Sequence, residues 1–404
     1  MRVLFTAGPG TGHFHPLVPV AKALQQAGHT VAFATADSSR EMVERSGFGF
    51  FSTGAEWMAM VAQGGMGGMK SFEDFQRIQR EMMKTDLPAF LKMMLQMFVG
   101  RFGNATLPQV IAAASTFRPE LIVRNSMEYA GCVAAEHLGL PHASIQVGGV
   151  RPGDYPPEAL VEQLDALRAK AQLPPDPALQ MLYRYLHLSL MPASYFQGGM
   201  PTTTHYLSPR TFDQSGSEGL PAWVEKREGR PILYITLGTV ANRLLHLLNP
   251  LIAGVRDEPL EIIVTVGRDQ DPAQLGPQPP NVHVERYIPQ SLLLPKCELA
   301  IMHGGYSSIS SGLIHGLPLV IVPVAADQPM NARLSQAFGA AEVLDTEALT
   351  PEVVRSAVRK VRSTPSYRQA AQRFQADAAT LPPVEHAVAL LERLVKEKAP
   401  LPGA

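Results

Sequence analysis

The sequence lacks the features of secreted, membrane-spanning and nucleic-acid-binding proteins. It has only two cysteines, Cys132 and Cys297, far apart and each in an apolar segment, which predicts two reduced core thiols and not a disulfide scaffold. A formal net charge of -1 offers no basic surface to nucleic acid or to an anionic membrane. No run of about 18 apolar residues could span a bilayer, and no signal peptide opens the sequence. We therefore expect a cytoplasmic protein.

What the sequence does contain is enough apolar material for two folded domains. It has 404 residues, of which 46% are hydrophobic and 18% are charged, so the chain is globular and not disordered. That length suits two domains with separate cores better than one.

The first forty residues alternate between strand and helix. Val3–Thr6 is apolar and β-prone, Gly8–Gly12 forms a tight turn, and Pro16–Gln26 carries helical periodicity. Gly28 ends that helix, and the strand Thr30–Thr35 follows. This βαβ pattern predicts a parallel sheet with right-handed crossovers.

The alternation recurs on both sides of a polar segment. Leu207–Pro231 is rich in glycine and proline with little periodicity, and it reads as a linker. We expect an N-terminal domain over residues 1–210, a linker over 211–230 and a second domain over 231–383. Residues 384–404 form an amphipathic C-terminal helix. Strands are predicted at Leu121–Val123, His142–Val147, Ile232–Leu237, Ile262–Val266, Val282–Glu285, Leu299–Met302 and Leu319–Val322, and a helix at Ala130–Leu138.

The strongest motif is His303-Gly304-Gly305-Tyr306-Ser307-Ser308, directly after an apolar strand. Glycines let the backbone approach a ligand, and the next helix would point its N-terminal amides at that ligand. The two serines add hydroxyl donors, and the positive end of the helix favours a diphosphate. The alternative is an ordinary strand-to-helix turn with serine caps. The nearby Tyr287-Ile288-Pro289-Gln290 and Asp327-Gln328 segments favour the ligand site.

These residues resemble the family-1 glycosyltransferases, and most closely the bacterial enzymes that decorate antibiotics and other natural products. The resemblance rests on the run Tyr287–Ala332 and on Gly10–Pro16 (GTGHFHP). It implies the GT-B fold: α/β, with two Rossmann-like domains facing a central cleft. The N-terminal domain would then bind the acceptor and the second domain the nucleotide sugar. The C-terminal helix would pack back on the N-terminal domain.

The resemblance also assigns roles on the donor side. Tyr287 would stack on the nucleobase, while Ile288 would contact that base through its backbone. Asp327 and Gln328 would bind the sugar hydroxyls. The diphosphate would be held by His303, Gly304, Gly305, Ser307 and Ser308, with Gly238 and Thr239 facing the phosphates.

Ser311 departs from the family pattern. Uridine-using relatives carry a glutamate there for the ribose hydroxyls. Since a deoxyribose lacks the 2′-hydroxyl, Ser311 favours a thymidine diphosphate (TDP) donor and leaves UDP open.

The resemblance makes His13 the general base that removes the acceptor proton during an inverting attack. Histidine suits that role because its pKa is near neutrality. The alternative is that His13 only caps the helix near Pro16. His15 would contact the acceptor, and a metal site is disfavoured because no third ligand follows at a useful spacing. Family members orient the base with an aspartate, but Asn125 stands there, and Glu128 one turn away could substitute.

The segment Trp57–Phe98 is unusually rich in methionine, which adapts to varied apolar ligands. The segment could form a surface that binds the acceptor, or its methionines could simply pack in a helical core. The sequence favours neither interpretation over the other. Acceptor contacts are predicted for Trp57, Met58, Met82 and Met93. The methionines of the segment are Met58, Met60, Met66, Met69, Met82, Met83, Met93, Met94 and Met97.

Three other functions compete with transfer. A nicotinamide-binding fingerprint fails because His13 stands where its third glycine belongs. An epimerase acting on nucleotide sugars explains the donor motifs but not a large apolar acceptor region. An idle binding or activator protein is kept open by Asn125. We expect no metal and no cofactor besides the sugar nucleotide as co-substrate, an apolar small-molecule acceptor as partner, and no nucleic acid; the sequence leaves a homodimer open.

Overall fold

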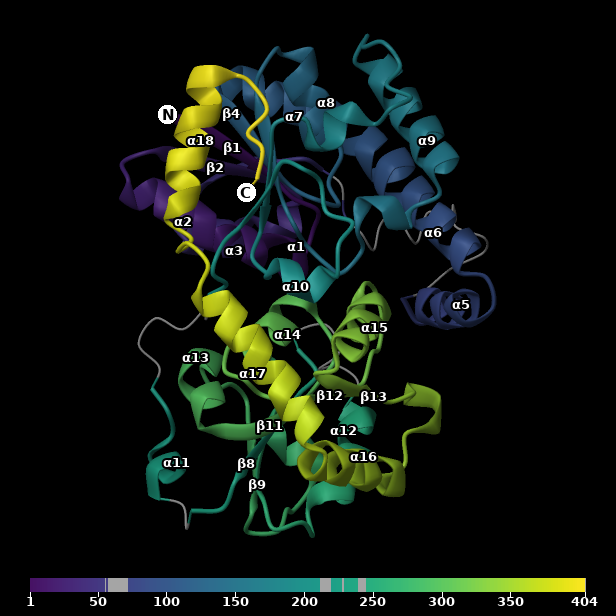
Figure 1. The fold of residues 1–404 in the computed structure, drawn as a ribbon, viewed down its shortest axis with the longest axis vertical. Coiled ribbons are helices and arrows are strands. Elements are labelled where there is room, and N and C mark those ends of the chain that lie inside the picture. The colour runs from purple at the N-terminus through teal and green to yellow at the C-terminus, as the bar shows by residue number, and fades with distance from the viewer. Residues whose placement is uncertain (55, 57–71, 211–218, 227–228, 239–244, 404) are drawn as a thin grey trace.

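The computed structural model describes residues 1–54, 56, 72–210, 219–226, 229–238 and 245–403. Trp57, Met58 and Thr239 therefore lie outside the described residues. Figure 1 shows two α/β domains, one above the other.

Each domain is built on one parallel sheet. The seven-stranded sheet has the order β3-β2-β1-β4-β5-β6-β7 and the six-stranded sheet the order β10-β9-β8-β11-β12-β13. The strands of the first are β1 (Arg2–Thr6), β2 (Thr30–Thr35), β3 (Gly49–Ser52), β4 (Leu121–Asn125), β5 (His142–Ile145), β6 (Leu186–Ser189) and β7 (Thr204–Tyr206). Those of the second are β8 (Ile232–Thr236), β9 (Glu261–Thr265), β10 (Val282–Glu285), β11 (Cys297–Met302), β12 (Leu319–Ile321) and β13 (Ala341–Val343).

Helices cover both faces of each sheet, so the strands are buried and read as nearly continuous apolar runs; all five residues of β8 are buried. The first domain has α1 (Thr11–Phe14), α2 (Val18–Gln26), α3 (Arg40–Arg45), α5 (Phe72–Thr85), α6 (Leu87–Leu95), a π-helix (Gln96–Gly103), α7 (Asn104–Phe117), α8 (Ala130–His137), α9 (Pro157–Lys170) and α10 (Ala193–Phe196). The rest are α11 (Ala222–Lys226), α12 (Leu245–Val255), α13 (Gln290–Leu293), α14 (Tyr306–Leu313), α15 (Gln328–Phe338), α16 (Pro351–Ser363), α17 (Pro365–Ala379) and α18 (His386–Glu397).

The predicted α/β fold is confirmed: two doubly wound, Rossmann-like sheets in tandem. β1 pairs with both β2 and β4, and β8 pairs with both β9 and β11. The strand order therefore reverses beside β1 in one sheet and beside β8 in the other. Ligands of such sheets bind at the carboxyl ends of the strands at these reversal points.

Two local features differ from the sequence prediction. The helix predicted from Pro16 begins earlier, as α1, and passes through a 3₁₀ turn (His15–Leu17) into α2. Pro16 has no N–H to continue the ladder of α1, so the chain tightens there. The predicted linker contains α11, whose Val224 is buried in the core of the second domain.

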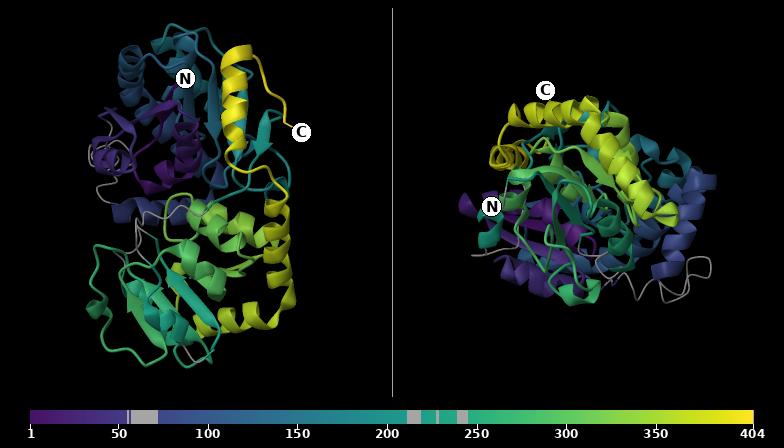
Figure 2. Two further views of the ribbon diagram at one scale, coloured as in Figure 1. Left: turned by 90° about the vertical axis from the view of Figure 1, so that its left-hand side faces the viewer. Right: turned by 90° about the horizontal axis from the view of Figure 1, so that it is seen from below.

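The end of the chain returns to the first domain. In Figures 1 and 2, α17 runs along the second domain and α18 lies against the first. Leu390, Leu391 and Leu394 of α18 share a core with Val3 and Phe5 of β1. The domain limits themselves stay predictions.

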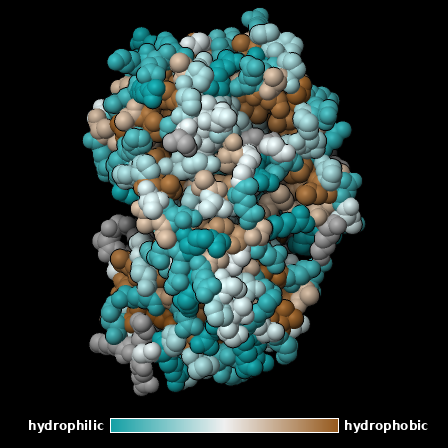
Figure 3. Space-filling model, in the orientation of Figure 1, coloured by the Kyte–Doolittle hydropathy of each residue, from teal (hydrophilic) through white to brown (hydrophobic). Residues whose placement is uncertain are grey.

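The surface is mixed in character. Figure 3 shows hydrophilic residues over most of the face it presents, with smaller apolar clusters between them. None of the helices that the structure describes is long and apolar enough to cross a membrane.

Candidate active site

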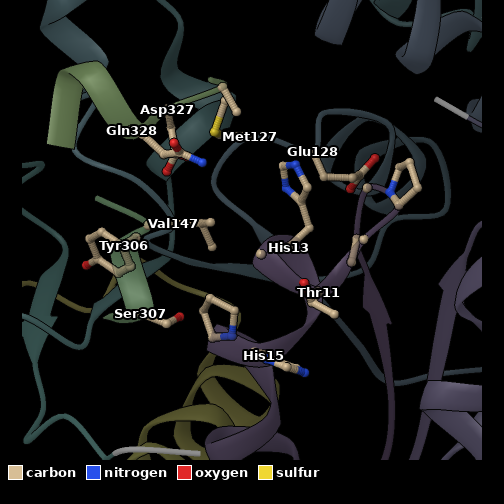
Figure 4. Close-up of a pocket in the computed structure, with 18 of the residues that line it drawn as sticks. Thr11, His13, His15, Met127, Glu128, Val147, Tyr306, Ser307, Asp327 and Gln328 are labelled. Carbon is tan, nitrogen blue, oxygen red and sulfur yellow. The ribbon is translucent and has the colours of Figure 1, made fainter. Parts of the chain in front are cut away.

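One cavity of about 900 Å³ lies between the carboxyl ends of the two sheets. Its walls come from both domains, and they include most of the residues that the sequence analysis singled out. Figure 4 shows His13 and Glu128 from the first domain opposite Ser307, Asp327 and Gln328 from the second.

His13 enters the cavity from α1, just beyond β1. The backbone at Gly8 packs under its ring, since a Cβ at Gly8 would lie 3.5 Å from two of its carbons. Phe98 packs beside it with 6.1 Å between ring centres. These dry surroundings lower the pKa of His13 to about 4, because burial disfavours the charged imidazolium. The ring is therefore neutral at pH 7.

Asn125, the last residue of β4, is fully buried and holds the His13 ring. Its Nδ2 lies 3.0 Å from Nδ1 of His13, and its Oδ1 accepts a hydrogen bond from the backbone N–H of Met127 at 2.9 Å. The predicted contact between Asn125 and His13 is thus present in the structure.

Arg124 organises the loop after β4. Its buried guanidinium donates to the backbone carbonyls of Asn125, Ser126 and Glu128, and to that of Leu182. Sequence reasoning missed this residue because a buried arginine bound to carbonyls has no local signature.

Glu128 also borders the cavity, but its carboxylate is occupied. It accepts hydrogen bonds from the Thr6 hydroxyl and from the backbone N–H of Gly131 at 3.0 and 3.1 Å, in the first turn of α8. Burial raises the pKa of Glu128. No hydrogen bond joins it to His13 within the described part of the chain, so Asn125 is the partner that the structure gives the imidazole.

His303 begins the donor side of the cavity, directly after β11. A Cβ at Gly305 would lie 2.5 Å from its Nε2, and one at Gly238 would lie 2.4 Å from its Cε1. A side chain at either position would therefore have to displace the His303 ring. Burial lowers the pKa of His303 to about 4.

Helix α14 points its N-terminus into the cavity. Gly305 is its N-cap and supplies no side-chain bond to the first amides, and Ser307 and Ser308 line the cavity in the first turn. Free amides, hydroxyls and the positive helix end together suit a diphosphate. Gly304 stands behind them with φ +87° and is not part of the described lining.

Asp327, the N-cap of α15, and Gln328, its first residue, reach the same cavity. Asn331 donates to Asp327 at 2.8 Å, and burial raises the pKa of Asp327. The side-chain carbonyl of Gln328 accepts from the backbone of Val324 and Ala325 at 2.8 and 3.0 Å, which fixes its orientation.

The far end of the donor side holds Tyr287, with the Arg268 guanidinium 3.8 Å from the ring centre. Ile288, the neighbour predicted to contact the base, is buried in the core of the second domain. Ser311 lines the cavity and is 6% exposed.

The first domain adds an apolar wall and a polar rim. His15 lines the cavity, and burial lowers its pKa to about 4. Met82 and Met93, predicted acceptor contacts, instead pack in a hydrophobic cluster and are not in the described lining. The apolar wall follows one face of α6 and the π-helix, and consists of Phe90, Leu91, Met94, Met97, Phe98 and Phe102.

Contacts between the domains lie beside the Asp327 loop. Gln79 of α5 bonds to both the N–H and the carbonyl of Ala326, the former at 2.9 Å. Asn331 accepts from the backbone N–H of Gly149 at 2.6 Å. Neither residue could be found from the sequence, since their partners are more than 180 positions away.

In the part of the chain that the structure describes, no three histidine, cysteine, aspartate or glutamate side chains are grouped so that they could hold a metal ion.

Two Rossmann-like domains, a shared cavity, an anion-binding helix end on one wall and a histidine on the other define a glycosyltransferase of the GT-B type. The chain belongs to the family described as Erythromycin biosynthesis protein CIII-like: the N-terminal domain model matches residues 22–238 and the C-terminal domain model residues 250–394. It is a nucleotide-sugar glycosyltransferase related to those of bacterial natural products.

Its relatives match over nearly their whole length. The 4'-demethylrebeccamycin synthase of Lentzea aerocolonigenes is 29% identical, with 98% of this chain and 99% of that protein covered. The aclacinomycin-T 2-deoxy-L-fucose transferase of Streptomyces galilaeus is 26% identical over 98% and 97%. The solved structure of glycosyltransferase SsfS6 from Streptomyces sp. SF2575, complexed with thymidine diphosphate, is 26% identical with a TM-score of 0.76, over 97% of this chain and 99% of that one.

Proposed function

We propose that this chain is a metal-independent hexosyltransferase that moves a deoxysugar from TDP, with inversion, to an apolar small-molecule natural product. The observation that carries the proposal is the cavity itself, which sets His13 opposite the α14 N-terminus across one continuous space. An attacking oxygen and a departing diphosphate can then lie on opposite sides of the anomeric carbon, as inversion requires.

The donor side supports a diphosphate without a cation. The N-terminus of α14, Ser307 and Ser308 lie at the cavity, which supports a role in stabilising the charge that builds up as the sugar bond breaks. Asp327 and Gln328 line the same cavity, which supports their proposed role in binding the sugar hydroxyls. The preference for TDP is supported by Ser311, and by the similarity to SsfS6, whose structure contains thymidine diphosphate.

The acceptor side supports an apolar molecule. The wall of Phe90, Leu91, Met94 and their neighbours offers aromatic and thioether surface with few polar groups. A deoxysugar is supported by the name of one relative, a 2-deoxy-L-fucose transferase. An epimerase would have no need of this apolar wall.

The first test is calorimetric titration of the purified protein with TDP, UDP and NADH in the presence of a chelator. We expect TDP to bind more tightly than UDP, and NADH to give no heat above the blank. Loss of TDP binding in the chelator would contradict metal independence, and binding of NADH alone would return the N-terminal glycines to a redox role.

The second test separates transfer from binding. His13→Ala should reduce transfer by roughly 10²- to 10⁴-fold while TDP affinity stays nearly unchanged, because His13 acts on the acceptor side. The exposed His246→Ala on α12 is the matched control and should keep full activity. If the wild-type protein binds TDP but transfers no sugar to any acceptor, the chain is the idle binding protein and not a transferase.

A further inference from the structure

The orientation of the Asn125 side chain is fixed by its two hydrogen bonds. A backbone N–H can only donate, so the atom 2.9 Å from the Met127 nitrogen must be the amide oxygen. The amide nitrogen then faces Nδ1 of His13 at 3.0 Å. Asn125 is fully buried and cannot rotate without leaving the Met127 N–H unpaired.

This orientation determines which ring nitrogen of His13 carries the proton. An amide nitrogen is only a donor, so Nδ1 of His13 must offer its lone pair, and the proton of the neutral ring lies on Nε2. An aspartate at position 125 would do the opposite: it would accept from Nδ1–H and leave Nε2 free to act as a base. Exchanging acid for amide at such a position changes the tautomer without changing the geometry.

Nε2 of His13 is the nitrogen left for the acceptor, since it makes no hydrogen bond to any residue that the structure describes. Other ionisable side chains that line the cavity include Glu128, His15 and Asp327. Glu128 is bound to Thr6 and Gly131, and Asp327 is bound to Asn331 on the donor side. Both carboxylates are therefore engaged with other partners and do not stand free to take the proton of an acceptor.

We infer that Asn125 is a tautomer-setting residue that makes His13 a hydrogen-bond donor at Nε2, and that this chain therefore takes acceptors whose attacking group is an acidic hydroxyl of the phenol class, already ionised. The inference rests on the proposed glycosyl transfer. The acceptor loses its proton to solvent before the chemical step. Its oxygen lone pair then forms the bond to the anomeric carbon, the bond from that carbon to the diphosphate breaks with its electron pair on the diphosphate, and no proton moves.

The His13 Nε2–H contributes by binding the phenolate. This N–H holds the phenolate oxygen in line with the anomeric carbon and, beside the apolar wall, weakens the hydration of that oxygen. An acceptor whose hydroxyl stays protonated gains nothing from this hydrogen bond. Asn125 is thus a positioning residue, and its effect depends on the acidity of the acceptor.

The tautomer can be read without any turnover. Nitrogen NMR of protein labelled with ¹⁵N-histidine distinguishes a protonated Nε2 from a protonated Nδ1, and the His13→Gln variant identifies the His13 signals among the 12 histidines. We expect Nε2–H in the wild type and Nδ1–H in Asn125→Asp. A wild-type ring protonated on Nδ1 would overturn the inference.

Acceptor selectivity gives the second reading. Wild type should transfer sugar to nitro- and fluoro-substituted phenols at rates that rise with their acidity, and should barely use an alkyl alcohol of the same shape. Asn125→Asp should gain about 10²-fold on the alcohol and lose its preference for acidic phenols. Equal wild-type rates on phenol and alcohol would overturn the inference. It would also be overturned if the wild type used the alcohol and Glu128→Gln abolished that activity, since Glu128 would then be the base.

Failure of the two proposals can be told apart. If no acceptor is glycosylated but the NMR shows Nε2–H, the proposed transfer fails and the tautomer assignment stands. If transfer occurs without dependence on acceptor acidity, the proposed function stands and the role of Asn125 falls. Should Asn125→Asp not fold, the wild-type NMR and the wild-type phenol series still decide.

Discussion

Gly238 and Gly305 lie so close to the His303 ring that neither position leaves room for a side chain. The Cβ positions of Gly238 and Gly305 would overlap its ring from either side, at 2.4 and 2.5 Å. The ring lines the cavity beside the first turn of α14, where the diphosphate is proposed to bind. Among the residues that the structure describes, the position of His303 is therefore constrained by these two glycines and not by a hydrogen bond to its buried Nδ1.

Gly305→Ala tests this packing. The new methyl group must displace the His303 ring and with it the contact that we propose it makes to the diphosphate, so we expect the Kd for TDP to rise about tenfold to a hundredfold. Calorimetric titration measures the change. Gly153→Ala, whose Cβ would meet nothing within 4 Å, is the matched control and should bind like wild type. Unchanged TDP affinity in Gly305→Ala would remove His303 from the diphosphate site.

At the scale of elements, α5 and the loop before α15 form a clamp between the domains. Ala326 has a left-handed φ of +58°, which costs free energy for a residue with a Cβ. Gln79 of α5 binds both backbone groups of Ala326 and so holds the loop that leads into Asp327 and Gln328. A helix of the acceptor domain therefore supports the residues proposed to bind the sugar.

Gln79→Leu should loosen this clamp. Two backbone groups of Ala326 lose their partners, so we expect the KM for the sugar nucleotide to rise roughly tenfold, with a smaller change in the affinity for TDP, which lacks the sugar. Steady-state kinetics and calorimetry measure the two quantities. Glu81→Gln, an exposed change on the same helix, is the control. Equal losses for TDP and for the sugar nucleotide would contradict a role specific to the sugar.

Helix α18 contributes to the core of the domain from which it is most distant in sequence. Leu391 is fully buried against β1 and α2, so Leu391→Ala should lower the free energy of unfolding by about 2–5 kcal/mol. Arg393→Ala on the exposed face should change it by less than about 0.5 kcal/mol. Denaturant unfolding followed by circular dichroism compares the two variants. Equal stabilities would show that α18 is not part of that core.

The sequence predicted what local patterns determine. Strands β2 and β10 have their predicted limits, and the turn after β11 lies in the cavity, because apolar runs and glycine-rich turns are local signals. Strands β3, β6, β7 and β13 were missed, since each is short and its edges are set by pairing within the sheet. Met94 and Met97 line the cavity while Met82 and Met93 do not, and only the orientation of α6 and its neighbours decides between them.

At the scale of the whole molecule, buried histidines make the fold sensitive to acid. Burial lowers the pKa of His13, His15 and His303 to about 4, and that of His142 and His187 to about 3, from an ordinary 6.5. Between these values the unfolded chain binds protons that the folded chain does not, so stability falls as the pH drops below about 6.5. Burial raises the pKa of Glu128 and Asp327, which opposes this trend only in part.

The acid sensitivity can be assigned to particular histidines. His187 and His142 lie on adjacent strands beside the buried Arg124, whose charge lowers both pKa values further. Melting temperatures measured from about pH 8 to about pH 4 should stay level down to about 6.5 and then fall. His187→Gln, which keeps a side chain able to bond to Ser144, should start lower but lose less on acidification, whereas the exposed His246→Ala should follow wild type. If His187→Gln falls as steeply as wild type, the acid lability arises at other histidines, and His13 and His303 of the cavity become the next ones to replace.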